Sequence, residues 1–187
     1  ILHSLAWSAA CCVPLPAAAQ AAFPSRPIRL VVPNAAGGAA DLTARTVGQR
    51  ISENLGQPVV VDNKPGAGGT IAMAELARAQ ADGYTIEFAS QGTLVFNQAL
   101  YSKPGYDSLK DFAPIILVGG VSNVMIVPPG SSSKTVMDVI AAAKAKPGMT
   151  FSSGGSGTSH HLSGVLFGQL SGTELTHVPY KGAPQGI

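Results

Sequence analysis

Apolar runs of strand length alternate with helical patterns from residue 23 onward, and this alternation restricts the fold more than any other feature of the sequence. The apolar runs occupy 28–33, 58–63 and 84–90, and helical spacings of apolar residues occupy 41–55 and 70–80. Continuous apolar strands that alternate with helices are typical of a parallel sheet covered on both faces. We therefore expect residues 23–114 to form the first domain of an α/β protein with mainly parallel sheets.

The alternation resumes after an irregular stretch at 102–114. Residues 115–129 are nearly continuously apolar, with small and polar residues near the middle, and predict two strands with a bend between them, where the chain crosses to a second domain. Further strands are predicted at 149–153 and 176–182, and further helices at 135–146, capped by Ser133 or Thr135, and at 158–171. The sequence stops within a loop pattern, so we expect residues 115–187 to form an incomplete second α/β domain.

The first 22 residues differ in composition from the rest, because they contain no Lys, Arg, Asp or Glu. The segment ends in small residues, and the triplet Ala-Gln-Ala at 19–21 fits a signal-peptide cleavage site. We therefore expect residues 1–22 to be a signal peptide that lacks its start, with an ordinary buried helix as the alternative. Both cysteines, Cys11 and Cys12, lie here, and Ser8 stands where a lipoprotein would carry Leu, so no lipid anchor is expected.

Charge and aromatic content argue against a nucleic-acid-binding protein. The formal net charge is +2, the twelve Lys and Arg residues are scattered along the chain, and aromatic residues make up 6%. Nucleic-acid binding requires a clustered basic face, and binding of single strands adds aromatic stacking. A hydrophobic fraction of 45% with 12% charged residues is instead typical of a chain that folds around an apolar core.

Three loops rich in small residues connect predicted strands to predicted helices, at 34–41, 63–70 and 153–158. In a parallel sheet such loops share the carboxyl edge, where open α/β sheets bind their ligands. Each loop leads to the first turn of a helix, whose unpaired N–H groups and positive dipole end favour an anion. Each loop by itself is more often just a tight turn, but three of them on one edge favour a binding site, so the sequence predicts an anion site formed mainly by main-chain amides.

Other anion-binding and catalytic patterns are absent or incomplete. The patterns G-x-x-x-x-G-K-[ST] and G-x-G-x-x-G do not occur, which disfavours a nucleotide enzyme, and no cofactor is expected. The region around Ser156 reads GGSGT and misses the nucleophile elbow G-x-S-x-G, so a small α/β hydrolase that uses Ser156 and His161 is kept as an alternative. His160 and His161, with distant His177, offer weak metal-ligand spacing, and no metal site is predicted.

Two polar residues within the helical patterns have two interpretations each. We expect Asp41 to cap the helix that follows the first loop, and the alternative is a contact with an amino or hydroxyl group of a solute. Asn97, within the pattern LVFNQAL, either caps a helix or reaches the cleft.

Several motifs follow one another in a specific order and cover nearly all of residues 23–183. They read FPSRPIRLVVPNAAGGAAD, LGQPVVVDNKPGAGGTI, ADGYTIEFASQGTLVFNQALY, DFAPIILVG, SNVMIVPP, AKAKPGMTFSSGGSGTSHHLSG and THVPYKG. This series resembles the Bug-type receptors, which are the extracytoplasmic solute-binding proteins of tripartite tricarboxylate transporters. Asn34 departs from the resemblance, since the family often has an aromatic residue there. Members of the family also run on beyond the length of this chain, so a nonfunctional fragment of such a receptor is a further alternative.

The resemblance implies a periplasmic receptor of two domains, a monomer and not an enzyme, that closes around a small carboxylate. The implied ligands are dicarboxylates or tricarboxylates, acidic amino acids and aromatic acids, and the implied partners are the membrane permease subunits that receive the solute. The residues implied to face the ligand are Ala36, Gly37, Gly38 and Asp41 in the first loop, Gly92, Thr93 and Asn97 after the third strand, and Ser156, Thr158, Ser159 and His161 in the second domain.

Overall fold

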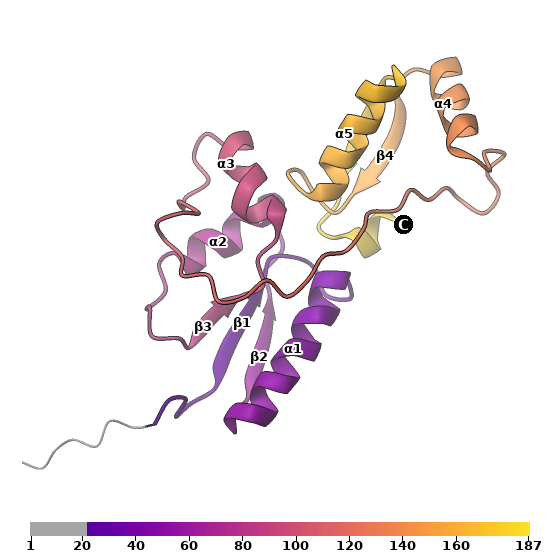
Figure 1. The fold of residues 1–187 in the computed structure, drawn as a ribbon. Helices are drawn as coiled ribbons and strands as arrows, with labels where there is room; N and C mark the ends of the chain where they lie inside the picture. The colour runs from indigo at the N-terminus through magenta and orange to yellow at the C-terminus, as the bar shows by residue number, and fades with distance from the viewer. Residues whose placement is uncertain (1–21) are drawn as a thin grey trace, which may run out of the picture.

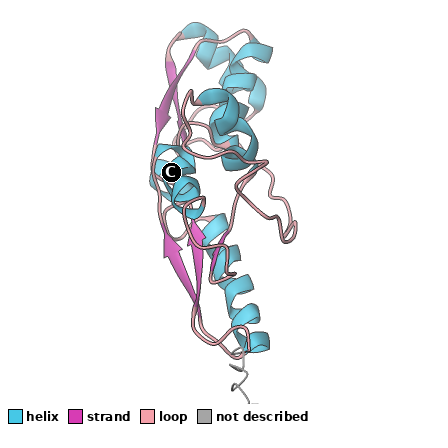
Figure 2. Ribbon diagram, turned by 90° about the vertical axis from the view of Figure 1, so that its left-hand side faces the viewer, coloured by secondary structure: helices cyan, strands magenta, loops and turns pink. Residues whose placement is uncertain are grey.

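The structure, a computed structural model, describes residues 22–187, so the predicted signal peptide lies almost entirely outside the described residues. Two separate parallel sheets, each accompanied by helices, are arranged end to end in an elongated molecule (Figure 1, Figure 2). The fold is therefore α/β with parallel sheets, as the alternation of apolar runs and helical patterns predicts.

The first sheet has the strand order β2-β1-β3, and its strands are β1 (Ile28–Val32), β2 (Val59–Asn63) and β3 (Thr85–Glu87). β1 lies in the middle, where Leu30 is paired with Val61 on one side and with Ile86 on the other. This central position explains why Val32 is completely buried. The apolar runs thus predicted all three strands, but β3 ends at Glu87 instead of residue 90.

Helix α1 (Ala39–Leu55) packs against this sheet. The buried core that they share consists of Leu30, Val32 and Ala44. Gly48 brings the helix close to the strands, since a Cβ there would lie 3.1 Å from Cγ1 of Val59. Gly56 follows the helix with φ 68°, the left-handed conformation that glycine adopts most easily, and so ends α1 where the sequence predicts.

α1 begins two residues earlier than the helical pattern predicts, and this changes the role of Asp41. The N-cap residue is Gly38, with an extended backbone, so Asp41 is the third residue of the helix. From this position its carboxylate reaches back and accepts the N–H of Gly37 over 2.8 Å. The prediction that Asp41 is the N-cap is therefore wrong, because glycine occupies the cap and the acidic residue stabilises the loop before it.

The remaining helices of this unit are short. α2 (Thr70–Leu76) ends before residue 80, because the amides of Arg78 and Ala79 donate to carbonyls only three residues back, as in 3₁₀ turns. A π-helical turn, Gly92–Phe96, leads into α3 (Asn97–Leu100). These two elements confirm that the pattern LVFNQAL is helical.

The second sheet pairs β4 (Met149–Ser153) with β5 (Leu175–Pro179) in parallel, with α4 (Val136–Ala145) before it and α5 (Ser159–Ser171) between its strands. α4 begins with a capping box, in which the hydroxyl of Thr135 accepts the N–H of Asp138 and the Asp138 carboxylate accepts the N–H of Thr135. Of the two predicted caps, Thr135 is therefore correct and Ser133 is not. Thr158 caps α5 by accepting the N–H of His161.

The apolar stretch at 115–129 forms no strand in the described structure, contrary to the prediction. It connects the two units (Figure 1). Its apolar residues are largely exposed, for example 88% of Leu117 and 81% of Val124. A strand requires hydrogen-bonding neighbours, and no strand of the described residues pairs with this stretch. Apolar composition indicates a tendency to form a strand, whereas pairing depends on a neighbour that composition does not reveal.

The two units approach each other at the carboxyl ends of their strands. Ala35, after β1, donates its N–H to the carbonyl oxygen of Lys181, after β5, over 3.3 Å. A second approach joins the loop after β2 to the loop after β4, where a Cβ on Gly68 would lie 2.1 Å from the carbonyl oxygen of Ser156. The loops that follow the strands of the two sheets therefore face one another.

Candidate functional site

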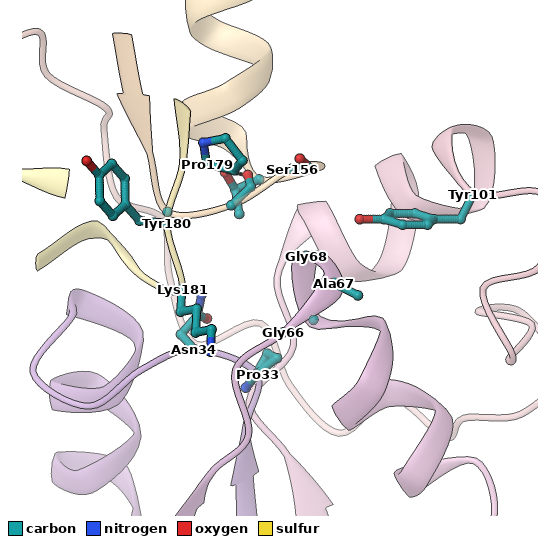
Figure 3. Close-up of a pocket in the computed structure, with 14 residues that line it drawn as sticks. Pro33, Asn34, Gly66, Ala67, Gly68, Tyr101, Ser156, Pro179, Tyr180 and Lys181 are labelled. Carbon is teal, nitrogen blue, oxygen red and sulfur yellow. Dashed lines mark hydrogen bonds between the residues drawn. The ribbon is translucent and has the colours of Figure 1, made fainter. Parts of the chain in front are cut away.

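A cavity of about 270 Å³ lies between these facing loops (Figure 3). Its lining comes from the loops after β1, β2, β4 and β5 and from the residue after α3. Small residues at 66–69 and 154–156 form much of the wall, and Tyr101, Tyr180 and Lys181 supply its larger side chains. Carboxyl edges of parallel strands thus enclose the cavity from two sheets, which is the place where open α/β sheets bind ligands.

Glycine is required where these loops touch. Gly68 has φ 61° and approaches the main chain of Ser156 so closely that no side chain fits between them. Gly157 faces Asn97 in the same way, since a Cβ on Gly157 would lie 2.3 Å from Asn97 Oδ1. The small residues of the loops therefore allow close contact with a neighbouring main chain at Gly68 and with the Asn97 side chain at Gly157, a role separate from any ligand.

Of the residues predicted to face a ligand, Ser156 and Thr158 line the cavity. The Thr158 hydroxyl also donates to the carbonyl of Gly155 over 2.7 Å, within the same loop. The other predicted residues do not belong to the lining, and they are Ala36, Gly37, Gly38, Asp41, Gly92, Thr93, Asn97, Ser159 and His161. Several of them hold the loops that form the cavity.

Asp41 holds the first loop in place through hydrogen bonds to its carboxylate. Its side chain is almost fully buried, and its carboxylate lies 3.0 Å from Arg45 Nη2 and accepts the Nδ2–H of Asn63 over 2.9 Å, besides the Gly37 amide. The hydrogen bond from Arg45 and those from the Gly37 amide and Asn63 lower the pKa of Asp41 to about 2, against the opposing effect of burial. Asn63 in turn donates to the carbonyl of Asn34, a residue of the cavity wall.

Asn97 joins the loops of both sheets. Its side chain is completely buried, and Nδ2 donates to the carbonyl of Gly68 over 3.0 Å. Its Oδ1 has no hydrogen-bond partner among the described residues and lies against Gly157. Thr93, also buried, uses its hydroxyl for hydrogen bonds with the main chain of Ser90. Gly92 lies against the carbonyl of Gly157, which a Cβ would approach to 2.8 Å.

His161 and Ser159 contact neighbours other than the cavity. His161 Nδ1 accepts the N–H of Gly157 over 3.2 Å, and its ring stacks on His177. Ser159 is directed to Asn123, with its hydroxyl 3.3 Å from Oδ1. No hydrogen bond joins Ser156 to His161 within the described structure, so the serine–histidine pair of the hydrolase alternative is not formed.

The main-chain amides of the loops are only partly free. Internal side chains accept hydrogen bonds from the amides of Gly37, Gly155 and Gly157. The amides of Asn34, Gly66, Gly154 and Ser156, which line the cavity, make no hydrogen bond to any described residue. Main-chain N–H groups from the loops after β1, β2 and β4 are therefore available at the cavity wall.

Three larger residues of the lining were missed by sequence reasoning, and they are Tyr101, Tyr180 and Lys181, whereas Asn34, which the sequence marks as a departure from the family, also lines the cavity. Two of them had a usable signal: Tyr180 and Lys181 belong to the strand-and-turn pattern at 176–182, whose end must lie at the carboxyl edge of its sheet. Tyr101 had none, because it reaches the cavity through the packing of α3 beside the loop after β2. Figure 3 shows Tyr101 and Tyr180 on opposite sides of the cavity.

Two other features are absent from residues 22–187. That part of the chain holds no group of three or more His, Cys, Asp or Glu side chains arranged for a metal ion. Its helices also lack a segment with the length and hydropathy needed to span a membrane.

Comparison with known proteins places the chain in a family. Residues 43–187 match the family described as "Tripartite tricarboxylate transporter family receptor". The chain belongs to this family of transport receptors. The resemblance carried by the sequence motifs is thereby confirmed.

A sequence relative and two solved structures of the family illustrate the likeness. A UPF0065 protein of Pseudomonas sp. strain P51, encoded between tcbD and tcbE, is 42% identical over 89% of this chain and 49% of its own length. An R. palustris protein solved with adipate is 37% identical with a TM-score of 0.84, over 87% of this chain and 55% of that one. The periplasmic binding protein BugD is 31% identical with a TM-score of 0.76, over 87% of this chain and 55% of its own. This receptor chain thus spans about half the length of the proteins it matches.

Proposed function

We propose that this chain is the solute-capturing part of a periplasmic receptor that binds a small carboxylate and delivers it to the membrane subunits of a tripartite tricarboxylate-type transporter. The carboxylate binds in the cavity between the carboxyl edges of the two sheets. No chemical conversion of the solute is part of this function.

The observation that carries the proposal is the chemistry of the cavity wall. Its side-chain polar groups are the hydroxyls of Ser156, Thr158, Tyr101 and Tyr180, the amide of Asn34 and the ammonium of Lys181, and no carboxylate belongs to the lining. The main-chain N–H groups of Asn34, Gly66, Gly154 and Ser156 have no hydrogen-bond partner among the described residues. Such donors satisfy the oxygen atoms of an anion, and no negative charge in the lining opposes its binding. Membership of a receptor family, together with a structural neighbour that holds adipate, agrees with this chemistry.

A binding measurement on the purified full chain tests the proposal. Isothermal titration calorimetry with adipate and with a small panel of other carboxylates is expected to give saturable binding, whereas adipamide, which has the same length without charge, is expected not to bind. Hydrolysis of a p-nitrophenyl ester serves as the control for an enzyme. Ester turnover that is lost in His161→Ala, without binding of any carboxylate, would contradict the receptor function.

A further inference from the structure

The elements around the second sheet contain no acidic or basic residue except histidine. β4, α5, β5 and the loop at 154–158 have no Asp, Glu, Lys or Arg, and neither has the connecting stretch at 115–129, which contacts α5. The side chains in these elements that titrate near neutral pH are His160, His161 and His177. A proton taken up by one of them therefore meets no negative side chain within these elements.

His161 holds the loop at 154–158 by a hydrogen bond that requires an unprotonated ring nitrogen. Its Nδ1 accepts the N–H of Gly157 over 3.2 Å, and a main-chain N–H can only donate. Gly157 also lies against Asn97 of the first unit, and its neighbour Ser156 lines the cavity. The hydrogen bond to His161 therefore helps to fix both the cavity wall and a contact between the two units.

A second imidazole ring lies against His161. The ring of His177 stacks on it with the centroids 4.0 Å apart, and His177 also stacks on Phe151, which carries no charge. Burial, followed by the charge of His161, lowers the pKa of His177. Glu174 and Lys181, the charged residues that flank β5, form no ion pair with either ring in the described structure. A positive charge on the stacked pair is therefore not neutralised by a described side chain.

We propose that His161 is a pH-sensitive switch of solute capture, because a proton on its Nδ1 frees the N–H of Gly157 and weakens binding of the solute. This inference rests on the proposed function and adds a regulation to it. A protonated Nδ1 is a donor, so it opposes the main-chain N–H that it accepted before. The solute binds to the arrangement in which the loop is fixed, and this arrangement requires the unprotonated Nδ1. Proton and solute therefore oppose one another, and affinity falls as the pH falls.

Calorimetric titration of the full chain with sodium adipate at about pH 8 and about pH 6 measures the effect. The wild type is expected to bind adipate about threefold to tenfold more weakly at the lower pH, which is the loss of one hydrogen bond in the cavity wall. His161→Asn keeps an acceptor oxygen near the position of Nδ1 and takes up no proton, so its affinity is expected to change by less than about twofold. His160→Asn, at an exposed neighbouring position, is the matched control and is expected to behave as the wild type. Protonation of adipate is the same for all three proteins and cancels in the comparison.

Amide NMR spectra of the wild type provide a second measurement that needs no variant. The signal of the Gly157 N–H is expected to move upfield as the pH is lowered, because this N–H loses its acceptor. A Gly157 signal that does not respond to pH would overturn the inference. The same pH dependence of adipate affinity in wild type and His161→Asn, with both folded by circular dichroism, would also overturn it while leaving the proposed function intact. Absence of binding by the wild type to adipate and to every other carboxylate tested at about pH 8 would overturn both.

Discussion

The imidazole rings of His161 and His177 stack with their centroids 4.0 Å apart and with 22° between their planes. At one end of this stack, His161 Nδ1 accepts the N–H of Gly157; at the other, His177 Nε2 lies 2.6 Å from Oγ of Ser153. The same Oγ accepts the N–H of Gly155 over 3.0 Å. The stacked pair therefore fixes the loop at 154–158, which forms one wall of the cavity.

This arrangement predicts that acid destabilises the second unit. Burial, followed by the nearby charge of His161, lowers the pKa of His177 below its usual 6.5. A histidine with a lowered pKa in the folded state stabilises the fold fully above the unfolded pKa, and this contribution is lost as the pH falls below about 6.5 toward the lower folded pKa. His177→Gln keeps a polar atom near the position of Nε2 and cannot be protonated, so its stability is expected to depend less on pH.

Thermal unfolding at about pH 7.5 and about pH 5 measures the effect. The wild type is expected to lose about 2–4 °C more than His177→Gln over this interval, which corresponds to about 1 kcal/mol for a chain of this size. His160→Gln, which replaces an exposed neighbour, is the control and is expected to behave as the wild type. Identical pH dependence in wild type and His177→Gln would show that the stacked pair does not sense pH.

The contact between Gly68 and Ser156 predicts that a single methyl group disrupts the cavity. In Gly68→Ala the new Cβ would lie 2.1 Å from the carbonyl oxygen of Ser156, so one of the two loops has to move. Gly56 offers a matched control, because its φ of 68° is close to the 61° of Gly68 but no atom lies within 4 Å of a Cβ placed there. Both variants carry the same backbone strain, of about 1 kcal/mol, and only Gly68→Ala adds the clash.

Calorimetric titration with adipate separates these effects. Gly68→Ala is expected to bind adipate at least about tenfold more weakly than the wild type, because misplaced groups lose their charge-assisted hydrogen bonds. Gly56→Ala is expected to bind as the wild type does, with a thermal midpoint lowered by a few degrees. Equal adipate affinity in the two variants would mean that the two loops need not touch for binding.

The sheets were predictable from sequence because their signal is local. β1 and its two neighbours follow from continuous apolar runs, and the place of the loops at 34–41 and 153–158 follows from the rule that parallel strands share a carboxyl edge. Nothing more than periodicity and turn residues was needed for this part. The approach of two such edges is a tertiary relationship, and the resemblance to a family of two-domain receptors implied it where periodicity did not.

The composition of the site was less predictable, since it depends on contacts between distant segments. Asn97 had an undecided role because its partner, the carbonyl of Gly68, lies in another loop. The sequence predicts an N-cap at Asp41 because it does not show that Gly38 takes the extended backbone of that position. The stretch at 115–129 shows the same limit, because an apolar run predicts a strand without revealing whether a partner strand is adjacent.

Glu87, at the end of β3, predicts a stability that decreases toward alkaline pH. Both of its carboxylate oxygens are buried and have no hydrogen-bond partner among the described residues. Burial, reinforced by the negative charge of Glu75, raises the pKa of Glu87 to about 8 from its usual 4.5. Because the folded state holds the proton more tightly than the unfolded chain, this contribution to stability is fully present below about pH 4.5 and is lost as the pH rises through about 8.

Glu87→Gln is therefore expected to be more stable than the wild type at about pH 9, by roughly 2–4 kcal/mol, and to match it near pH 4.5. Urea unfolding at both pH values measures the difference, and Glu53→Gln, at an exposed position of α1, is the control that should shift little at either pH. A Glu87→Gln variant that is less stable than the wild type at about pH 9 would mean that the Glu87 carboxylate is ionised and compensated in the folded protein. In that case the region between β3 and α2 would have to supply a cation to Glu87, although Arg29 and Lys64 there already pair with Glu75.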